Sequence, residues 1–253
     1  MEYGKLLDCL LTLGEQMLIC GAEISRVEDT IGRISDTYNV EKTDVFVITS
    51  VMFLTLTDGE SNTFSGTRRV SKYNTNLDKL HKYNDLSRQL CAEPASVEEF
   101  EQRIEEIKSE KPYPLPVQCL VCAMISASFT LFFGGGFRDA AVSAVIGIIL
   151  KLVIFAQSKT KVNMVFSNVI SSAVLSALAL LAVKSGIGQE ASKIIIGNIM
   201  ILIPGVGLTN SIRDIISGDI ISGMLRLFEA VIVSLAIAAG YILMAVVFGG
   251  VGI

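Results

Sequence analysis

The sequence contains no tryptophan, a single histidine and only five prolines among 253 residues. The histidine, His81, stands beside two lysines in KLHKYNDL, a setting typical of a solvated side chain and not of a general base. The chain also lacks the patterns G-x-G-x-x-G, the P-loop lysine, G-x-S-x-G and H-E-x-x-H. These absences argue against the common dinucleotide, nucleotide, serine-hydrolase and zinc-protease sites. We therefore expect no catalytic residue, no metal and no cofactor, although carboxylates of the first half leave hydrolase chemistry open.

Cysteine is scarce as well, with five residues, an odd number that fits no complete disulfide framework. Cys119 and Cys122 match C-x-x-C but lie in an apolar stretch with no second Cys or His pair nearby. The spacing favours packing over metal or redox chemistry.

Charge is missing from most of the second half of the chain. Residues 1–112 hold 20 acidic and 13 basic side chains, whereas residues 113–253 hold only 5 and 8. The whole chain is 51% hydrophobic, with a mean hydropathy of +0.57, which is too apolar for an average soluble protein. The pattern predicts a soluble acidic domain over 1–112 and a transmembrane domain over 113–253. An acidic first half without a basic stripe argues against nucleic acid as a partner.

The soluble half mixes helical and strand patterns. Apolar residues recur at helical steps from Met17 to Ile34, which predicts one long amphipathic helix with charge pairs on a solvated face. The run from Asp44 to Thr57 predicts a long strand apolar on both faces and therefore covered on both. Asp58-Gly59 and SNTFSGTRRV then predict a turn and a returning strand. Helical patterns follow over 76–90 and, capped by Ser96, over 97–108, so the class is α+β.

The N-terminus carries Glu2, Lys5 and Asp8 within its apolar pattern, so no secretory signal forms. The first domain is therefore expected in the cytoplasm. KPYPLP marks the boundary, because three prolines within five residues cannot continue a helix. Five spans are predicted after it, at Leu115–Phe133, Ala140–Ala156, Met164–Val183, Ile194–Leu208 and Leu227–Phe248.

Lysine and arginine in the short connections give the expected orientation. Lys159 and Lys161 lie in the connection after the second span, and Arg213 and Arg226 in the one after the fourth. Their distribution favours a cytoplasmic N-terminus and, after five spans, an external C-terminus at Ile253. The chain is thus predicted to be a multi-pass protein of the cytoplasmic membrane.

The fourth span breaks at Pro204-Gly205, and an amphipathic segment with charges follows. Ionisable groups at membrane depth are costly unless they pair or line a wet cavity, and broken helices build substrate sites in transporters. The candidate residues for a substrate or ion pathway are Pro204, Gly205, Asn210, Arg213, Asp214, Asp219, Arg226 and Glu229. The alternative is an interfacial helix whose charges rest among lipid headgroups.

Two stretches resemble the threonine/serine exporter family in its split, two-component form. GAEISRVEDTIGRISDTY, with Glu23, Arg26 and Glu28, is similar to the family's first helix, and IPGVGLTNSIRDIISGDIISGMLRLFEA to its signature after the fourth span. The resemblance covers nearly the whole chain. It implies an exporter of threonine, serine or a dicarboxylate such as succinate, driven by the proton gradient.

The resemblance also implies a second small membrane subunit as partner, and an oligomer in the lipid bilayer. In this interpretation Arg226 pairs with a substrate carboxylate, and Asp219 or Glu229 carries a proton or balances that arginine. The competing hypothesis is a membrane-tethered enzyme or sensor with a hydrolase-like soluble domain. A third is a scaffold for a partner that transports alone.

Overall fold

The computed structural model describes residues 2–71, 73–160 and 162–249. Lys161 and the C-terminus at Ile253, on which the orientation partly rests, lie outside these ranges. The chain divides into two compact units, and the first comprises Met1–Lys111 together with Gly205–Phe228. Pro112–Pro204 and Glu229–Ile253 form the second. The segment 205–228, which the sequence analysis assigned to the transmembrane domain, therefore belongs to the first unit.

The first unit begins with two helices where one was expected. Helix α1 (Tyr3–Ile19) ends before Cys20, and α2 (Ile24–Thr37) begins four residues later, so the prediction of one helix from Met17 to Ile34 was wrong. Gly21 adopts φ +96°, a left-handed conformation that glycine accepts without strain. Its amide bonds to the Leu18 carbonyl at 3.1 Å, and the amide of Ala22 to that of Met17 at 2.9 Å. These bonds close α1 and turn the chain into a corner.

The sheet has three antiparallel strands in the order β1 (Lys42–Ile48), β2 (Val51–Thr57) and β3 (Thr63–Arg69). Phe46 of β1 lies opposite Phe53 of β2, which lies opposite Thr67 of β3. The single strand predicted from Asp44 to Thr57 is in fact a hairpin that turns between Ile48 and Val51. The turn predicted at Asp58 is confirmed, since its carboxylate accepts hydrogen bonds from the amides of Glu60 and Asn62.

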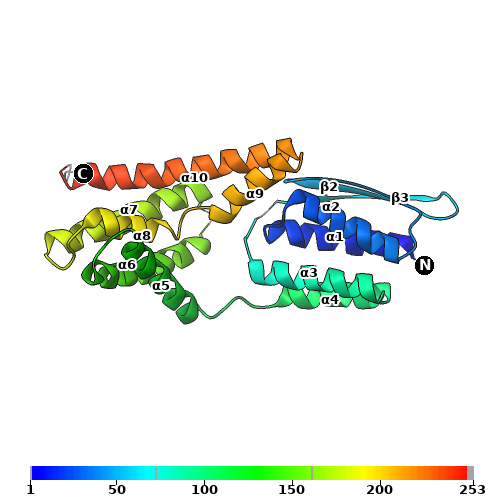
Figure 1. Ribbon diagram of the computed structural model, residues 1–253, viewed down its shortest axis with the longest axis horizontal. Coiled ribbons are helices and arrows are strands. Elements are labelled where there is room, and N and C mark those ends of the chain that lie inside the picture. The colour runs from blue at the N-terminus through cyan, green and yellow to red at the C-terminus, as the bar shows by residue number, and fades with distance from the viewer. Residues whose placement is uncertain (1, 72, 161, 250–253) are drawn as a thin grey trace. The chain divides into compact units, whose positions relative to one another are not determined.

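The first unit is layered, with α1 and α2 against one face of the sheet (Figure 1). Val47, Met52 and Leu54 are buried on that face. On the other face the rings of Phe46 and Phe53 stack 6.3 Å apart and are 57% and 46% exposed, so the expectation that both faces are covered was wrong. The β-branched and aromatic residues that suggested two-sided burial instead alternate between a buried and an exposed face.

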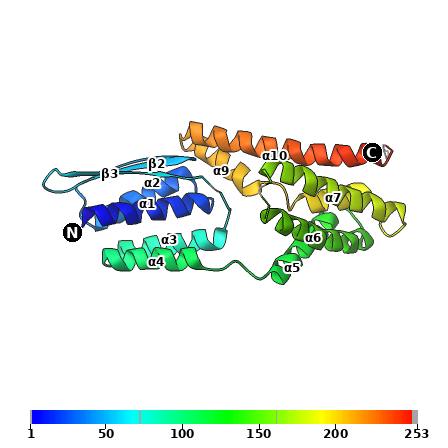
Figure 2. The ribbon, with the colours of Figure 1, turned by 180° about the vertical axis from the view of Figure 1, so that it is seen from behind.

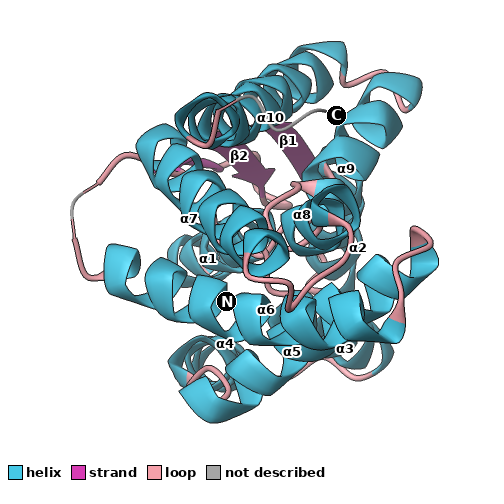
Figure 3. Ribbon diagram, turned by 90° about the vertical axis from the view of Figure 1, so that its left-hand side faces the viewer, coloured by secondary structure: helices cyan, strands magenta, loops and turns pink. Residues whose placement is uncertain are grey.

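Helices α3 (Leu77–Ala92) and α4 (Val97–Ser109) form a third layer beyond α1 and α2, as the reverse view shows (Figure 2). Asn76 caps α3 by accepting a hydrogen bond from the Lys79 amide at 3.0 Å. Ser96 caps α4 through the Glu99 amide at 3.2 Å, as predicted. The α+β character of this unit is therefore confirmed, with all strands of the described chain in one small sheet (Figure 3).

The second unit consists of helices. Its described elements are α5 (Leu115–Phe132), α6 (Phe137–Ser158), α7 (Met164–Lys184), α8 (Ala191–Ile199) and most of α10 (Ile220–Val247). Within the described residues, α5, α6, α7 and α10 are long and apolar enough to cross a membrane. The prediction of one continuous helix over Ile194–Leu208 was wrong, because α8 has 9 residues and ends at Ile199. A separate helix, α9 (Gly205–Ile216), begins after Pro204.

Close packing in the second unit depends on small residues, as is common between helices in lipid. A Cβ on Gly147 of α6 would lie 2.5 Å from Ser126 Oγ of α5, and one on Gly197 of α8 would lie 2.1 Å from Thr130 Oγ1. Ser172 Oγ of α7 donates to the Ile237 carbonyl of α10 at 2.6 Å. These contacts bring polar side chains into the helix interfaces of a mostly apolar unit.

Candidate functional site

The corner between α1 and α2 presents backbone groups that no helix uses. The carbonyls of Gly21 and Ala22 accept hydrogen bonds from outside α1 and α2, and the Ile24 amide is one of the first amides of α2, which have no partner within their helix. Glu23 occupies the N-cap position of α2 without capping it through its side chain. The corner therefore needs hydrogen-bonding partners from elsewhere in the chain.

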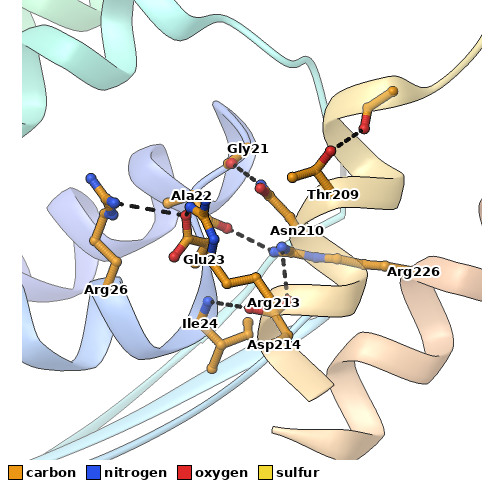
Figure 4. A network of polar contacts seen from close by, with 11 residues as sticks. Gly21, Ala22, Glu23, Ile24, Arg26, Thr209, Asn210, Arg213, Asp214 and Arg226 are labelled. Atoms are coloured by element: carbon orange, nitrogen blue, oxygen red, sulfur yellow. Dashed lines mark hydrogen bonds and ion pairs between the residues drawn. The ribbon is translucent and has the colours of Figure 1, made fainter. Parts of the chain in front are cut away.

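Helix α9 supplies three of these partners from one face (Figure 4). Asn210 Nδ2 donates to the Gly21 carbonyl at 2.7 Å, and Asp214 Oδ1 accepts from the Ile24 amide at 3.1 Å. Arg213 forms an ion pair with Glu23. Positions 210, 213 and 214 are three and four apart, so a helix places all of them on the side that meets the corner.

Arg226 of α10 completes the network. Its Nη2 donates to the Ala22 carbonyl at 2.9 Å, and its Nη1 lies 3.0 Å from Asp214 Oδ2. The Asp214 side chain is fully buried and that of Arg226 is 11% exposed. Removing one member of such a buried pair leaves an uncompensated charge, so the two residues are strongly coupled. We call Gly21, Ala22, Glu23, Ile24, Asn210, Arg213, Asp214 and Arg226 the corner network.

Asp214, the fully buried carboxyl of the corner network, has a raised pKa. Burial raises the pKa of Asp214 above its ordinary value, while Arg226 and the Ile24 amide act in the opposite direction. Asp219 and Glu23 raise it further, since two more carboxylates nearby disfavour a third negative charge.

Two further carboxyls, those of Asp219 and Glu28, interact electrostatically with each other near the network. Burial raises the pKa of Asp219. Burial also raises the pKa of Glu28, opposed by the Val47 amide that donates to its Oε1 at 2.9 Å and reinforced by Asp219. Glu28 thus links α2 to β1 through a hydrogen bond and is partly buried.

The structure brings together most of the residues that the sequence selected. Arg26 lies 3.7 Å from Glu23, whose side chain is only 13% exposed and also pairs with Arg213. The predicted solvated, charge-paired face is therefore wrong at Glu23. It holds for Asp29 and Arg33, which pair at 2.9 Å on the surface. Arg226 pairs with Asp214, whereas the sequence analysis gave that place to Asp219 or Glu229.

The other predicted residues lie outside the corner network. Gly205 is the first residue of α9, where its carbonyl accepts a hydrogen bond from Thr209 Oγ1 at 3.0 Å. Pro204 and Glu229 belong to the second unit, and Glu229 is exposed. In the part of the chain that the structure describes, no three His, Cys, Asp or Glu side chains gather as metal ligands.

Sequence reasoning missed the backbone carbonyls of Gly21 and Ala22, which accept two of the network's hydrogen bonds. A glycine that follows an apolar helical run was the available signal, because it marks a helix end with unpaired backbone groups. Asp139, which is buried in the second unit, was also passed over. Its signal was a lone acidic residue at the start of an apolar span.

Comparison with known proteins matches nearly the whole chain to one family. A family model described as "Putative threonine/serine exporter" matches residues 8–249. The chain is 24% identical to a "Threonine/serine exporter" of Corynebacterium glutamicum, over 94% of this chain and 50% of that protein. It is 20% identical to a "Probable threonine/serine exporter" of Mycobacterium tuberculosis, over 96% of this chain and 46% of that protein.

A fungal relative, "Pheromone-regulated membrane protein 10" of Eremothecium gossypii, is 25% identical over 95% of this chain and 33% of its own length. The chain thus spans about half the length, or less, of these curated relatives. No solved structure matches the chain.

Proposed function

Because the chain belongs to the threonine/serine exporter family, we propose that it is the membrane subunit of an exporter for threonine, serine or a dicarboxylate such as succinate. The proton gradient drives export in this proposal, and a second small membrane subunit takes part, as in the two-component exporters that the sequence resembles. Family membership and the four apolar helices support a membrane transporter. The substrate, the coupling ion, the partner and the cytoplasmic position of the first domain are the proposed parts.

The proposed topology has five crossings, the fourth of them broken. If the first unit is in the cytoplasm, the three crossings by α5, α6 and α7 bring the chain to the outside at Lys184, where α7 ends. Helix α9 belongs to the first unit, so the chain between Lys184 and Gly205 has to return to the cytoplasmic side. Helix α8 covers only about 14 Å of that distance at 1.5 Å per residue, less than half of a hydrocarbon core of about 30 Å. The turns up to Pro204 would complete the crossing.

The observation that carries the proposed mechanism is the buried pair of Arg226 and Asp214. Arginine binds carboxylates through parallel N–H groups, and amino acids and dicarboxylates both carry a carboxylate. In our proposal a substrate carboxylate replaces Asp214 as the partner of Arg226. Asp214 then takes up a proton from the cytoplasm, because a buried carboxyl without a cation beside it is neutral, and it returns the proton to the cytoplasm when the substrate leaves Arg226. This local proton is not the one that enters in exchange for the exported substrate. Substrate binding and protonation are thereby linked at one arginine.

The remaining pathway residues have subordinate roles in this proposal. Asn210, Arg213, Glu23 and Arg26 hold α9 against the corner while Arg226 exchanges partners. Asp219 and Glu28 accept or release protons at the cytoplasmic side. Pro204, Gly205 and Glu229 flank this region along the path, at the break after α8 and on α10.

Efflux from reconstituted vesicles tests the proposal. Vesicles that contain the full chain, with and without its small membrane partner, are loaded with radiolabelled threonine, serine or succinate. We expect efflux that requires both proteins and increases when the outside is acidic. Arg226→Ala should reduce efflux about tenfold or more, as expected when a buried charge-assisted contact to the substrate is lost. Asp29→Asn, outside the network, should leave efflux unchanged.

The competing hypotheses predict different results. If the partner alone exports the substrates, the chain is a scaffold and the proposal fails. If the full chain hydrolyses amides or esters and Glu23→Gln abolishes the activity, the soluble domain is an enzyme. If the Arg226→Ala variant exports substrate at the same rate as the unmodified chain, Arg226 does not have the proposed role.

A further inference from the structure

The short helix α8 leaves one side of α10 partly uncovered. Helix α8 ends at Ile199 after 9 residues, about 14 Å at 1.5 Å per residue, whereas α10 continues to Val247. An open groove of about 400 Å³ lies between the two helices, within the second unit. A groove of this size can receive several large side chains of another helix.

The groove is apolar apart from a few hydroxyls. Its walls include Ile195, Ile199 and Ile203 on the α8 side and Ser234, Ala238 and Tyr241 on the α10 side. The three residues of α10 are spaced four and three apart, so they share one face of the helix. No charged side chain lines the groove. It therefore does not suit an amino acid or a dicarboxylate, whose charges need polar partners away from water.

The groove face of α10 differs from the neighbouring exposed faces of the same helix. Those faces carry bulky residues such as Ile232, Leu235 and Leu243, each at least 50% exposed. In the groove the exposed residues Ser234 and Ala238 are small. Small residues four apart let the backbones of two helices approach closely in lipid. The groove face thus has the composition of a helix interface.

Tyr241 adds a requirement that a lipid tail does not meet. Glu229 is exposed, and an exposed carboxylate does not lie in hydrocarbon. Tyr241 follows it by twelve residues, about 18 Å along α10, and so lies inside a hydrocarbon core of about 30 Å. Its hydroxyl forms no hydrogen bond with any residue that the structure describes. A lipid tail has no acceptor for this hydroxyl, whereas a helix has carbonyls and polar side chains.

We propose that the groove between α8 and α10 binds a transmembrane helix of the second, small membrane subunit. This inference rests on the proposed function, which includes that subunit. The chain covers only 50% and 46% of the two bacterial relatives, which carry about as much chain again in the same polypeptide. A separate subunit has no such covalent link, so it needs a binding surface within the membrane.

A second copy of the chain is the weaker candidate for the same groove. Two copies related by a twofold axis would bring one groove against the other, and both would remain unfilled. A helix of a different protein fills the groove directly, with small residues against Ser234 and Ala238 and an acceptor for the Tyr241 hydroxyl.

Photocrosslinking identifies the occupant. The full chain, with p-benzoylphenylalanine in place of Ala238, is reconstituted in vesicles with the small membrane protein of the efflux assay. The matched control has the same substitution at Leu235, which is 65% exposed outside the groove. We expect the adduct from position 238 to contain a transmembrane peptide of the subunit, at least about fivefold above that from position 235. An adduct with lipid only, an adduct with this chain's own peptides, or equal yields at the two positions would overturn the proposal.

Substitutions then separate docking from folding. Ala238→Trp fills the groove and should weaken association with the subunit about tenfold or more, whereas Leu235→Trp should stay within about twofold. Tyr241→Phe removes one hydroxyl and should weaken association about threefold, the effect of one hydrogen bond between helices in lipid. The thermal unfolding of the chain alone should not change, because that hydroxyl has no partner in the described chain. Energy transfer between labelled proteins in vesicles measures association. Unweakened association of Ala238→Trp would refute the docking site.

The docking site and the proposed function fail separately. If the two proteins export none of the three substrates but position 238 is crosslinked to the subunit, the proposed function is wrong and the docking site stands. If they export substrate while position 238 is crosslinked only to lipid, the docking site is wrong and the proposed function stands.

Discussion

Arg226 holds two partners at once, the Asp214 carboxylate and the Ala22 carbonyl, and both contacts are largely shielded from water. A charge in such a position is tolerated only because its partners replace the hydration that it has lost. Arg213, by contrast, pairs with Glu23 at the surface, with 54% of its side chain exposed. The two arginines of the corner network therefore contribute very differently to stability.

We predict that Arg226→Ala destabilises the chain by about 3–5 kcal/mol, because Asp214 is left buried without its cation. Arg213→Ala should cost less than about 1 kcal/mol, as is usual for exposed pairs. Unfolding of the purified variants in detergent measures both. Asp214→Asn combined with Arg226→Ala should recover part of the loss. Equal effects of the two arginine substitutions would contradict the buried pair.

Asp219 makes the stability of the first unit depend on pH. Burial raises its pKa above the ordinary value of 3.8, so the folded chain keeps this proton at a pH where the unfolded chain has lost it. Between these two pKa values the contribution of Asp219 to stability falls as the pH rises. Asp219→Asn should be more stable than the unmodified chain at neutral pH and no more stable below about pH 3. Unfolding over a pH series measures this, with the surface variant Asp29→Asn as the control that should gain nothing.

The sequence identified the charged residues of the site but not their partners. Asn210, Arg213 and Asp214 stood out because they interrupt an apolar region, and that signal is local. Their partners lie about 190 residues earlier, and several are backbone atoms that any residue type provides. Periodicity carries no information on contacts of this kind, so Arg226 was matched to the acidic residues nearest to it in sequence.

Among the elements, α8 differs most from expectation. Its apolar pattern continued toward Leu208, but the helix ends at Ile199, and turns lead to Pro204. Gly197 lies against Thr130 of α5, at a point where a larger residue has no room. The close approach of α8 to α5 therefore depends on this glycine.

Gly197→Ala should destabilise the second unit by about 1–3 kcal/mol, because the added methyl group would lie 2.1 Å from Thr130 Oγ1 and 2.8 Å from the Thr130 amide nitrogen. Gly32→Ala is the matched control within α2, where the space around a Cβ is empty. It should leave stability unchanged or raise it by up to about 1 kcal/mol, since alanine is the better helix former. Thermal unfolding of both variants distinguishes the two cases, and a neutral Gly197→Ala would refute the tight contact.

Long helices were predictable from sequence, and breaks within apolar runs were not. The spans that became α5, α6, α7 and α10 are uniform enough for composition to predict them. The turn between β1 and β2 and the corner after α1 lie inside continuous apolar patterns, so tertiary packing decided them. Thr49-Ser50 and Gly21 were the only local signals.

At the scale of the whole chain, the proposed topology places Ser185 outside and Ser217 in the cytoplasm. Single cysteines at these positions, with Cys91 and Cys119 replaced by serine, should react with a membrane-impermeant maleimide from opposite sides of the membrane. In that proposed topology the chain crosses the membrane once between the end of α7 and the end of α9. Labelling of both positions from one side would contradict the broken fourth crossing.

Helix α10 is continuous from Ile220 to Val247, and it starts in the first unit and ends in the second. At 1.5 Å per residue, its 28 residues form a rod of about 42 Å. Arg226 and Tyr241 therefore stand on one unbroken helix, and no loop separates the last residue of the corner network from the apolar part of α10.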